Sequence, residues 1–286
     1  MFALWLALLP FFVLPASALL GGVCTWLALR RQEPGDGHLL GFFLAATLFF
    51  VGASLAVPRS DWFRERFDPQ VRADRVVMAD PVNAALRDTK PWEWEKLQPF
   101  VQQAAVGGMP PPQILARTRE QQLPLVRHYL PFAFGTPVLR YAEAVLPALQ
   151  ELKARDPALC VRLAWKNGGP AFPVAAQLSP ETGAAYQDAA GLVVRRAELD
   201  FSKSRDARNA DPVAAPVEMR EVQLAYRAIL DELQPQHGDV VAKLRSREVA
   251  QLEPAAACDA TIALFRRALD QDRRVAAHLL SDFLRD

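Results

Sequence analysis

The chain begins with two long apolar stretches, and the charged residues that precede position 58 all lie between them. Residues 2–29 and 39–57 contain no Asp, Glu, Lys or Arg, and a short connection with Pro34 and Gly37 separates them. About 20 apolar residues in a helix span the ~30 Å hydrocarbon core of a bilayer. The pattern therefore predicts a hairpin of two transmembrane helices that anchors the chain in a lipid bilayer.

Two other interpretations of the first stretch fit the sequence less well. Ala16-Ser17-Ala18 resembles a signal-peptide cleavage site, but no basic region precedes it and the apolar run continues beyond it. Cys24 follows Val23, whereas a lipoprotein signal needs a small residue immediately before the modified cysteine. We therefore expect an uncleaved first helix in which Cys24 is inert.

Beyond Pro58 the apolar residues recur at helical spacing. Thr136-Pro137 combines a capping hydroxyl with a proline suited to the first helical turn, and Leu139, Ala142, Leu146 and Leu149 then form an apolar stripe. No alternating run of β-branched residues suggests a strand. The sequence predicts an all-α fold. The expected helices begin near residues 91, 113, 123, 136, 157, 180, 217, 238, 255 and 273.

These patterns divide the chain into three parts. Residues 1–57 form the membrane anchor, 58–90 a juxtamembrane connector and 91–286 an α-helical extramembrane domain. Residues 201–216 are polar and rich in turn-forming residues, so we expect a mobile loop there that could divide the domain into two lobes. Within the connector, three aromatic residues lie among arginines, as expected of a segment at the membrane interface. These are Trp62, Phe63 and Phe67.

The basic residues beside the two spans give conflicting signals about orientation. Arg30 and Arg31 follow the first helix, which places the short connection in the cytoplasm and the domain outside. Five arginines between residues 59 and 75 favour the opposite arrangement. We favour a domain that faces the periplasm of a bacterial inner membrane, because of the cysteines described next.

The helical domain contains two cysteines, Cys160 and Cys258, each on an apolar helical face. An isolated pair in an otherwise cysteine-free domain is typical of one disulfide in an oxidising compartment. Two buried free thiols, packed as small apolar side chains, are the alternative interpretation. The sequence leaves both interpretations open, so a disulfide between Cys160 and Cys258 is a hypothesis at this point.

Composition excludes one class of partner. The 33 basic and 32 acidic residues give a formal charge of +1, whereas a nucleic-acid binder usually carries a basic excess. We therefore expect no nucleic-acid partner. Arginine far outnumbers lysine among the basic residues, which suggests a GC-rich bacterial source.

No recognisable catalytic or ligand-binding motif is present. The sequence lacks a Walker loop, a dinucleotide-binding glycine pattern, a zinc-protease motif, a nucleophile elbow and a C-x-x-C pair. The four histidines lie far apart, with none at metal-ligand spacing from another. Asn167 to Pro170 could form an anion-binding nest, but Gly-Gly-Pro more simply ends a helix. We predict no catalytic, cofactor-binding or metal-ligating residue and no cofactor.

Two aromatic residues close together raise the question of a carbohydrate surface. Trp92 and Trp94 alternate with Glu93 and Glu95, and aromatic rings can stack on sugar faces. Residues two apart on a helix point to different sides, however. We therefore expect one buried and one exposed tryptophan.

Two functional hypotheses follow. The first is a non-catalytic, membrane-anchored helical module that binds another protein, either as an accessory subunit of an envelope complex or as an immunity-type protein. The alternative is an envelope enzyme that acts on lipid or peptidoglycan through carboxylates without a fixed motif. A cleft with carboxyl groups of raised pKa would favour the enzyme, and an apolar surface would favour the binding module.

Overall fold

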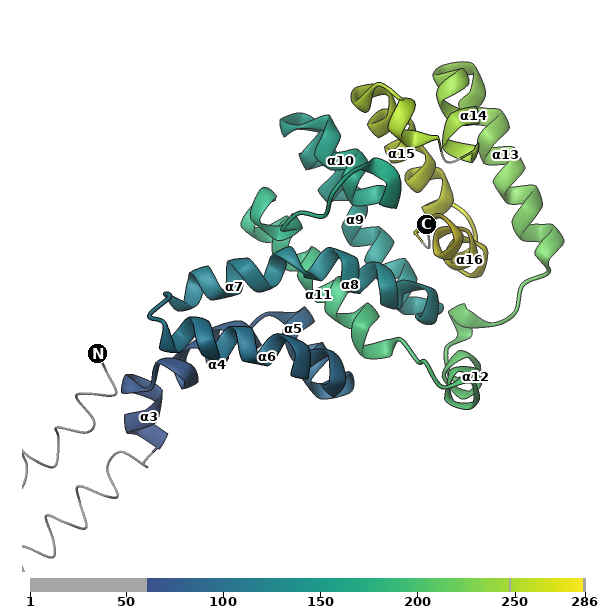
Figure 1. Ribbon diagram of the computed structural model, residues 1–286. Coiled ribbons are helices and arrows are strands. Elements are labelled where there is room, and N and C mark those ends of the chain that lie inside the picture. The colour runs from purple at the N-terminus through teal and green to yellow at the C-terminus, as the bar shows by residue number, and fades with distance from the viewer. Residues whose placement is uncertain (1–60, 247, 285–286) are drawn as a thin grey trace, which may run out of the picture. The chain divides into compact units, whose positions relative to one another are not determined.

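A computed structural model describes residues 61–246 and 248–284 of the chain, and within these ranges all regular elements are helical (Figure 1). The all-α prediction is confirmed for this part of the chain. The predicted spans at 2–29 and 39–57 lie outside the described residues. Among the helices that are described, none combines the length and apolar character needed to cross a membrane.

Contacts divide the chain into two compact units, residues 1–72 and 73–286. The described part of the first unit contains α3 (Asp61–Phe67) and the beginning of α4 (Pro69–Met78). The second unit begins within α4. This division differs from the expected boundaries at residues 57 and 90, because the segment from Ala73 onward already belongs to the helical domain.

The second unit continues with helices that begin close to the predicted positions. Short 3-10 turns join several of them, for example η2 (Leu130–Phe132) between α8 and α9. The helices are α5 (Pro81–Thr89), α6 (Pro91–Val106), α7 (Pro111–Glu120), α8 (Gln122–Tyr129), α9 (Thr136–Arg155), α10 (Pro157–Ala164), α11 (Pro180–Arg196), α12 (Phe201–Ala210), α13 (Met219–His237), α14 (Asp239–Ser246), α15 (Pro254–Leu269) and α16 (Arg273–Leu284).

Proline and side-chain caps explain where many of these helices start. Proline suits the first turn because its missing N–H has no intrahelical partner there and its φ angle is already helical. Asp80, Asp156, Ser179 and Glu253 each precede such a proline and accept hydrogen bonds from the free N–H groups of the first turn. The helix boundaries are therefore encoded locally, which is why the sequence pattern predicts them.

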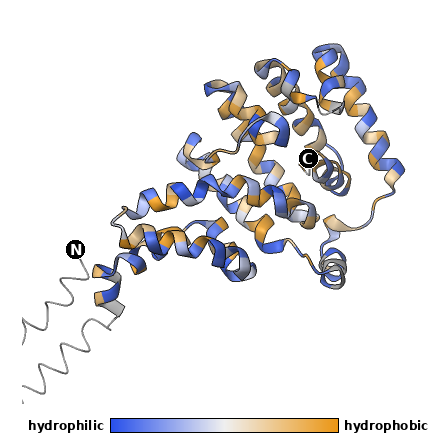
Figure 2. Ribbon diagram, viewed as in Figure 1, coloured by the Kyte–Doolittle hydropathy of each residue, from blue (hydrophilic) through white to orange (hydrophobic). Residues whose placement is uncertain are grey.

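The main hydrophobic core surrounds α9. This helix packs against α10, α11, α15 and α16, and α13 packs in turn against α15 and α16 (Figure 1). Val145, Leu149 and Leu152 of α9 are almost fully buried. The helices carry hydrophobic and hydrophilic residues side by side along their length, as expected for amphipathic helices around a shared core (Figure 2).

α5 packs closely against α11, and a glycine permits the approach. A Cβ atom at Gly191 would lie 2.7 Å from the carbonyl oxygen of Pro81, so a larger residue would force the helices apart. α5 is thus an integral part of the domain rather than part of a connector. The main core contains residues from both sides of the 201–216 segment, such as Val193 and Ile229. The segment therefore does not separate two cores.

A second, smaller core joins α4, α6 and α7. It contains Ala73, Val77, Trp94, Val101, Ala105 and Ile114. Trp94 is 8% exposed and Trp92 is 45% exposed, which confirms the prediction of one buried and one exposed tryptophan.

Residues 201–216 differ from the predicted mobile loop. The structure has α12 there, followed by η5 (Pro212–Ala214). α12 lacks an apolar stripe, so helical periodicity gives no signal for it. Instead, contacts with distant residues hold the segment in place: Arg208 stacks on Phe134, and Asp211 binds the start of α9.

Candidate functional site

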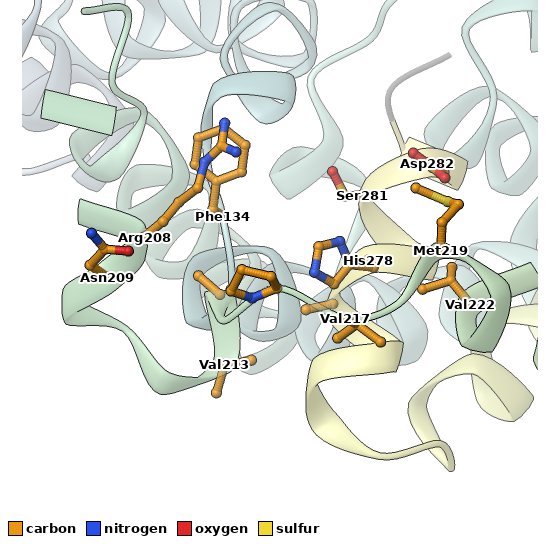
Figure 3. A pocket seen from close by; sticks show the side chains of 14 residues that line it. Phe134, Arg208, Asn209, Val213, Val217, Met219, Val222, His278, Ser281 and Asp282 are labelled. Atoms are coloured by element: carbon orange, nitrogen blue, oxygen red, sulfur yellow. The ribbon is translucent and has the colours of Figure 1, made fainter. Parts of the chain in front are cut away.

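A cavity of about 570 Å³ lies between the α12–η5 segment, the start of α13 and the last turns of α16 (Figure 3). This volume is within the range of sites that hold a small molecule or a single protruding side chain. Its lining combines apolar side chains with a few polar groups that are spread around it (Figure 3). The apolar side chains include Phe134, Val213, Val217, Met219 and Val222, and the polar ones are Arg208, Asn209, His278, Ser281 and Asp282.

Arg208 and Phe134 form one wall of the cavity. The guanidinium carbon of Arg208 lies 3.7 Å from the centre of the Phe134 ring, within the range of a cation–π contact. The contact restrains an otherwise exposed arginine and keeps its positive charge beside the opening.

Asp211 fixes the same wall to the beginning of α9. Its Oδ2 accepts a hydrogen bond from the backbone N–H of Thr136 at 2.7 Å, and its Oδ1 accepts one from the Thr136 hydroxyl at 3.0 Å. Gly135 makes this approach possible, since its φ angle is +64° and a Cβ there would lie 2.5 Å from Asp211 Oδ2. Asp211 therefore caps α9 from 75 residues away.

His278 of α16 lies among the cavity side chains (Figure 3). Its Nε2 atom is buried and has no hydrogen-bond partner within the described part of the chain. A buried ring nitrogen without a partner carries a desolvation cost, which a bound polar group could offset. No local sequence pattern indicates this residue, because the cavity forms only when α13 and α16 come together.

Two further cavities lie elsewhere in the domain. One of about 820 Å³ is lined by His237, Arg266 and the ion-paired Lys153 and Asp259. Another of about 350 Å³ lies beside Arg119, Gln187 and Asp188. Each of the three cavities has a single carboxylate in its lining: Asp282 in the cavity beside His278, Asp259 in the 820 Å³ cavity and Asp188 in the 350 Å³ cavity.

Several carboxylates on the surface act as helix caps. Burial alone raises the pKa of Glu151, but hydrogen bonds from the backbone N–H and hydroxyl of Ser179 outweigh it, and the pKa is lowered. Backbone N–H groups likewise lower the pKa of Glu253 and that of Asp272. These groups favour their ionised form, which suits capping rather than proton donation.

A buried polar network centres on Asp80, which is 2% exposed. Asp80 caps α5, accepts a hydrogen bond from Arg119 Nε at 2.8 Å and accepts another from Gln122 Nε2 at 2.7 Å. Gln122 in turn accepts a hydrogen bond from Gln187 of α11 at 2.9 Å. The network joins α5, α7, α8 and α11, so its role is to hold these helices together. The Asp-Pro pair at residues 80–81 indicates the cap, but no local pattern indicates the distant partners.

Cys160 on α10 and Cys258 on α15 are joined by a disulfide, with Cα atoms 5.8 Å apart. Both residues are fully buried. Trp165 Nε1 donates a hydrogen bond to Thr261 Oγ1 at 2.9 Å and thereby connects the same two helices. The pair lies in the main core, away from the cavity beside His278, so its role is structural.

Another buried group involves two tyrosines and an arginine. The hydroxyls of Tyr141 and Tyr186 lie 3.4 Å apart, and burial raises the pKa of each. Arg127 Nη2 donates to the carbonyl oxygens of Arg162 and Trp165 at 2.5 and 3.1 Å, at the end of α10. Burial lowers the pKa of Arg127.

The aromatic residues predicted at the membrane interface lie on α3. The rings of Phe63 and Phe67 are 4.7 Å apart, and Phe67 is 37% exposed. Trp62 belongs to the same helix.

Across residues 61–246 and 248–284, no group of three or more His, Cys, Asp or Glu side chains is arranged to hold a metal ion. Comparison of the chain with models of known protein families, with curated proteins and with solved structures found no match.

Proposed function

We propose that this chain is a non-catalytic module, anchored in a bacterial inner membrane, whose helical domain binds another protein. The anchor is the predicted hairpin of transmembrane helices at 2–29 and 39–57. The partner inserts an apolar side chain into the cavity between α12, α13 and α16. Such a partner suits an accessory subunit of an envelope complex or an immunity-type protein.

The observation that carries the proposal is the composition of that cavity. Val213, Val217 and Val222 provide apolar surface, and Met219 at its edge is 63% exposed. A flexible methionine at the rim adapts to different partner shapes, and an apolar pocket suits an anchoring side chain. Arg208 and His278 supply hydrogen-bond donors that could orient the partner's backbone or a polar side chain.

The carboxylates favour this proposal over the envelope enzyme. Hydrolysis of glycosidic bonds typically needs two carboxyl groups on opposite sides of the scissile bond. The cavity beside His278 has one, Asp282. The carboxyl pKa values that depart from their usual range in the described residues are lowered, whereas a general acid needs a raised one.

The cysteine pair supports a periplasmic location. A buried disulfide between Cys160 and Cys258 is stable where thiols are oxidised. A reporter fused after Asp286 that is active only outside the cytoplasm tests the orientation. Activity of a cytoplasm-specific reporter in the same fusion would contradict it.

Site-specific crosslinking in native membranes tests the binding function. A photo-crosslinking residue at Met219 should capture a discrete protein partner. The matched control is Leu224 on the same helix, which is 55% exposed and does not line the cavity. Equal capture from both positions, or none from Met219, would contradict binding at the cavity.

A further inference from the structure

The α6–α7 hairpin presents an exposed surface without charged residues. Residues 97–116 contain no Asp, Glu, Lys or Arg, and no uncharged stretch after residue 57 is longer. Val101, Ala105 and Ile114 are buried in the small core, but Phe100 is 39% exposed and Val106 is 68% exposed. We call the exposed part of residues 97–116 the uncharged hairpin surface. Because the surfaces of soluble domains are usually rich in mixed charges, this surface needs a physical explanation.

Apolar side chains form a line along the outer face of α6. Trp92, Pro99 and Val106 follow one another at intervals of seven residues, about two helical turns, and all three are exposed. At a rise of 1.5 Å per residue, the line is about 21 Å long. Phe100 follows Pro99, about 100° further around the helix, and is also exposed. Lys96, also on this face, pairs with Glu93 at 3.1 Å, and its long apolar stem can cover neighbouring apolar surface.

The position of the hairpin in the chain favours one occupant for this surface. The hairpin packs through the small core against Ala73 and Val77 of α4. Ala73 follows Val57, the last residue of the second uncharged stretch, by only 16 positions. A fully extended chain of this length reaches no more than about 55 Å, and helical segments such as α3 shorten that reach. The length of this segment therefore limits how far the small core of the hairpin can lie from the point where the predicted anchor leaves the bilayer.

We propose that the uncharged hairpin surface lies against the membrane interface, with lipid as its partner. This inference rests on the proposed membrane anchor. A face with tryptophan and phenylalanine, on which the charged end of Lys96 can extend toward the headgroups, suits the boundary between headgroups and acyl chains. Contact with lipid would also restrict the orientation of the domain, and with it the direction in which the cavity beside His278 faces.

Fluorescence quenching in vesicles tests the proposal on the full-length chain. With Cys24→Ser and the native disulfide left oxidised, a single Val106→Cys variant carries an environment-sensitive fluorophore. The matched control is Leu224→Cys on α13, where the native residue is 55% exposed. In vesicles of phosphatidylethanolamine and phosphatidylglycerol that contain a spin-labelled lipid, the probe at 106 should be quenched several-fold more than the probe at 224. Phe100→Glu in the Val106→Cys chain should reduce that quenching several-fold and leave the melting temperature unchanged.

The alternative outcomes separate the two proposals. If the protein floats with the vesicles but both probes are quenched equally by lipid, the lipid contact is wrong and the anchor stands. A probe at 106 that is shielded from both lipid and aqueous quenchers indicates a protein on this surface and also overturns the lipid contact. A chain that does not float with vesicles at all contradicts the membrane anchor itself.

Discussion

The carboxylate of Asp211 accepts hydrogen bonds from both the backbone N–H and the hydroxyl of Thr136. This contact caps α9, the helix around which the main core packs, with a side chain from a segment 75 residues later. The same segment supplies Arg208 and Val213 to the cavity. Stability of the core and the shape of the candidate site therefore depend on one carboxylate.

Replacement of Asp211 by alanine should affect stability and binding together. Loss of a helix cap costs about 1 kcal/mol, so the midpoint of urea unfolding should fall correspondingly. Crosslinking from Met219 should also weaken, because the wall of the cavity loses its attachment to α9. The control is Asp231→Ala on the exposed face of α13. Unchanged stability and crosslinking in Asp211→Ala would show that the contact does not hold the segment.

Asp80→Ala should be more destabilising than Asp211→Ala. It removes the cap of α5 and leaves Arg119 and Gln122 without their shared acceptor in a buried site. A cost of about 3 kcal/mol is expected for disrupting such a buried charge network. Asp80→Asn retains an oxygen acceptor, so its midpoint of chemical denaturation should lie between those of the wild type and Asp80→Ala. An alanine variant as stable as the wild type would rule out a structural role for the network.

Thiol labelling should find Cys24 as the reactive cysteine. After denaturation without reductant, a maleimide reagent should modify one thiol per chain, and after reduction three. The bridge spans 98 residues, and the chain-entropy model gives such a crosslink about 4.7 kcal/mol of stability. A double variant with Cys160→Ser and Cys258→Ser should therefore unfold at a much lower urea concentration than the wild type. Three labelled thiols in unreduced protein from its native membrane would contradict the disulfide.

Stability should fall on the alkaline side of the tyrosine titration. Burial raises the pKa of Tyr186 well above its usual value of 10.0, so the folded protein keeps a proton that the unfolded chain loses. This contribution is complete below pH 10 and is lost as the pH rises above it. Tyr186→Phe should flatten the decline in melting temperature above about pH 10. Both chains would carry Cys24→Ser. If the melting temperatures of Tyr186→Phe and of the chain with Tyr186 fell in parallel as the pH rises, Tyr186 would not be the cause of the alkaline loss of stability.

Local sequence signals predict most helices but not the contacts that build the site. Asp-Pro and Ser-Pro pairs mark helix starts, and the spacing of Trp92 and Trp94 predicts that one of the two is buried and the other exposed. By contrast, α12 has no apolar stripe, so the polar residues 201–210 suggest a loop. Its structure depends on Phe134 and Thr136, far away in the sequence. The same holds for His278, whose place in a cavity depends on how α13 and α16 pack.

The most direct test of the binding function fills the cavity. Ser281 is partly exposed at the lining, so Ser281→Phe should occupy the space with little effect on the core. Crosslinking from Met219 in native membranes should then fall several-fold, with the melting temperature and membrane association preserved. If the Met219 crosslink keeps its wild-type yield in Ser281→Phe, the cavity is not the binding site.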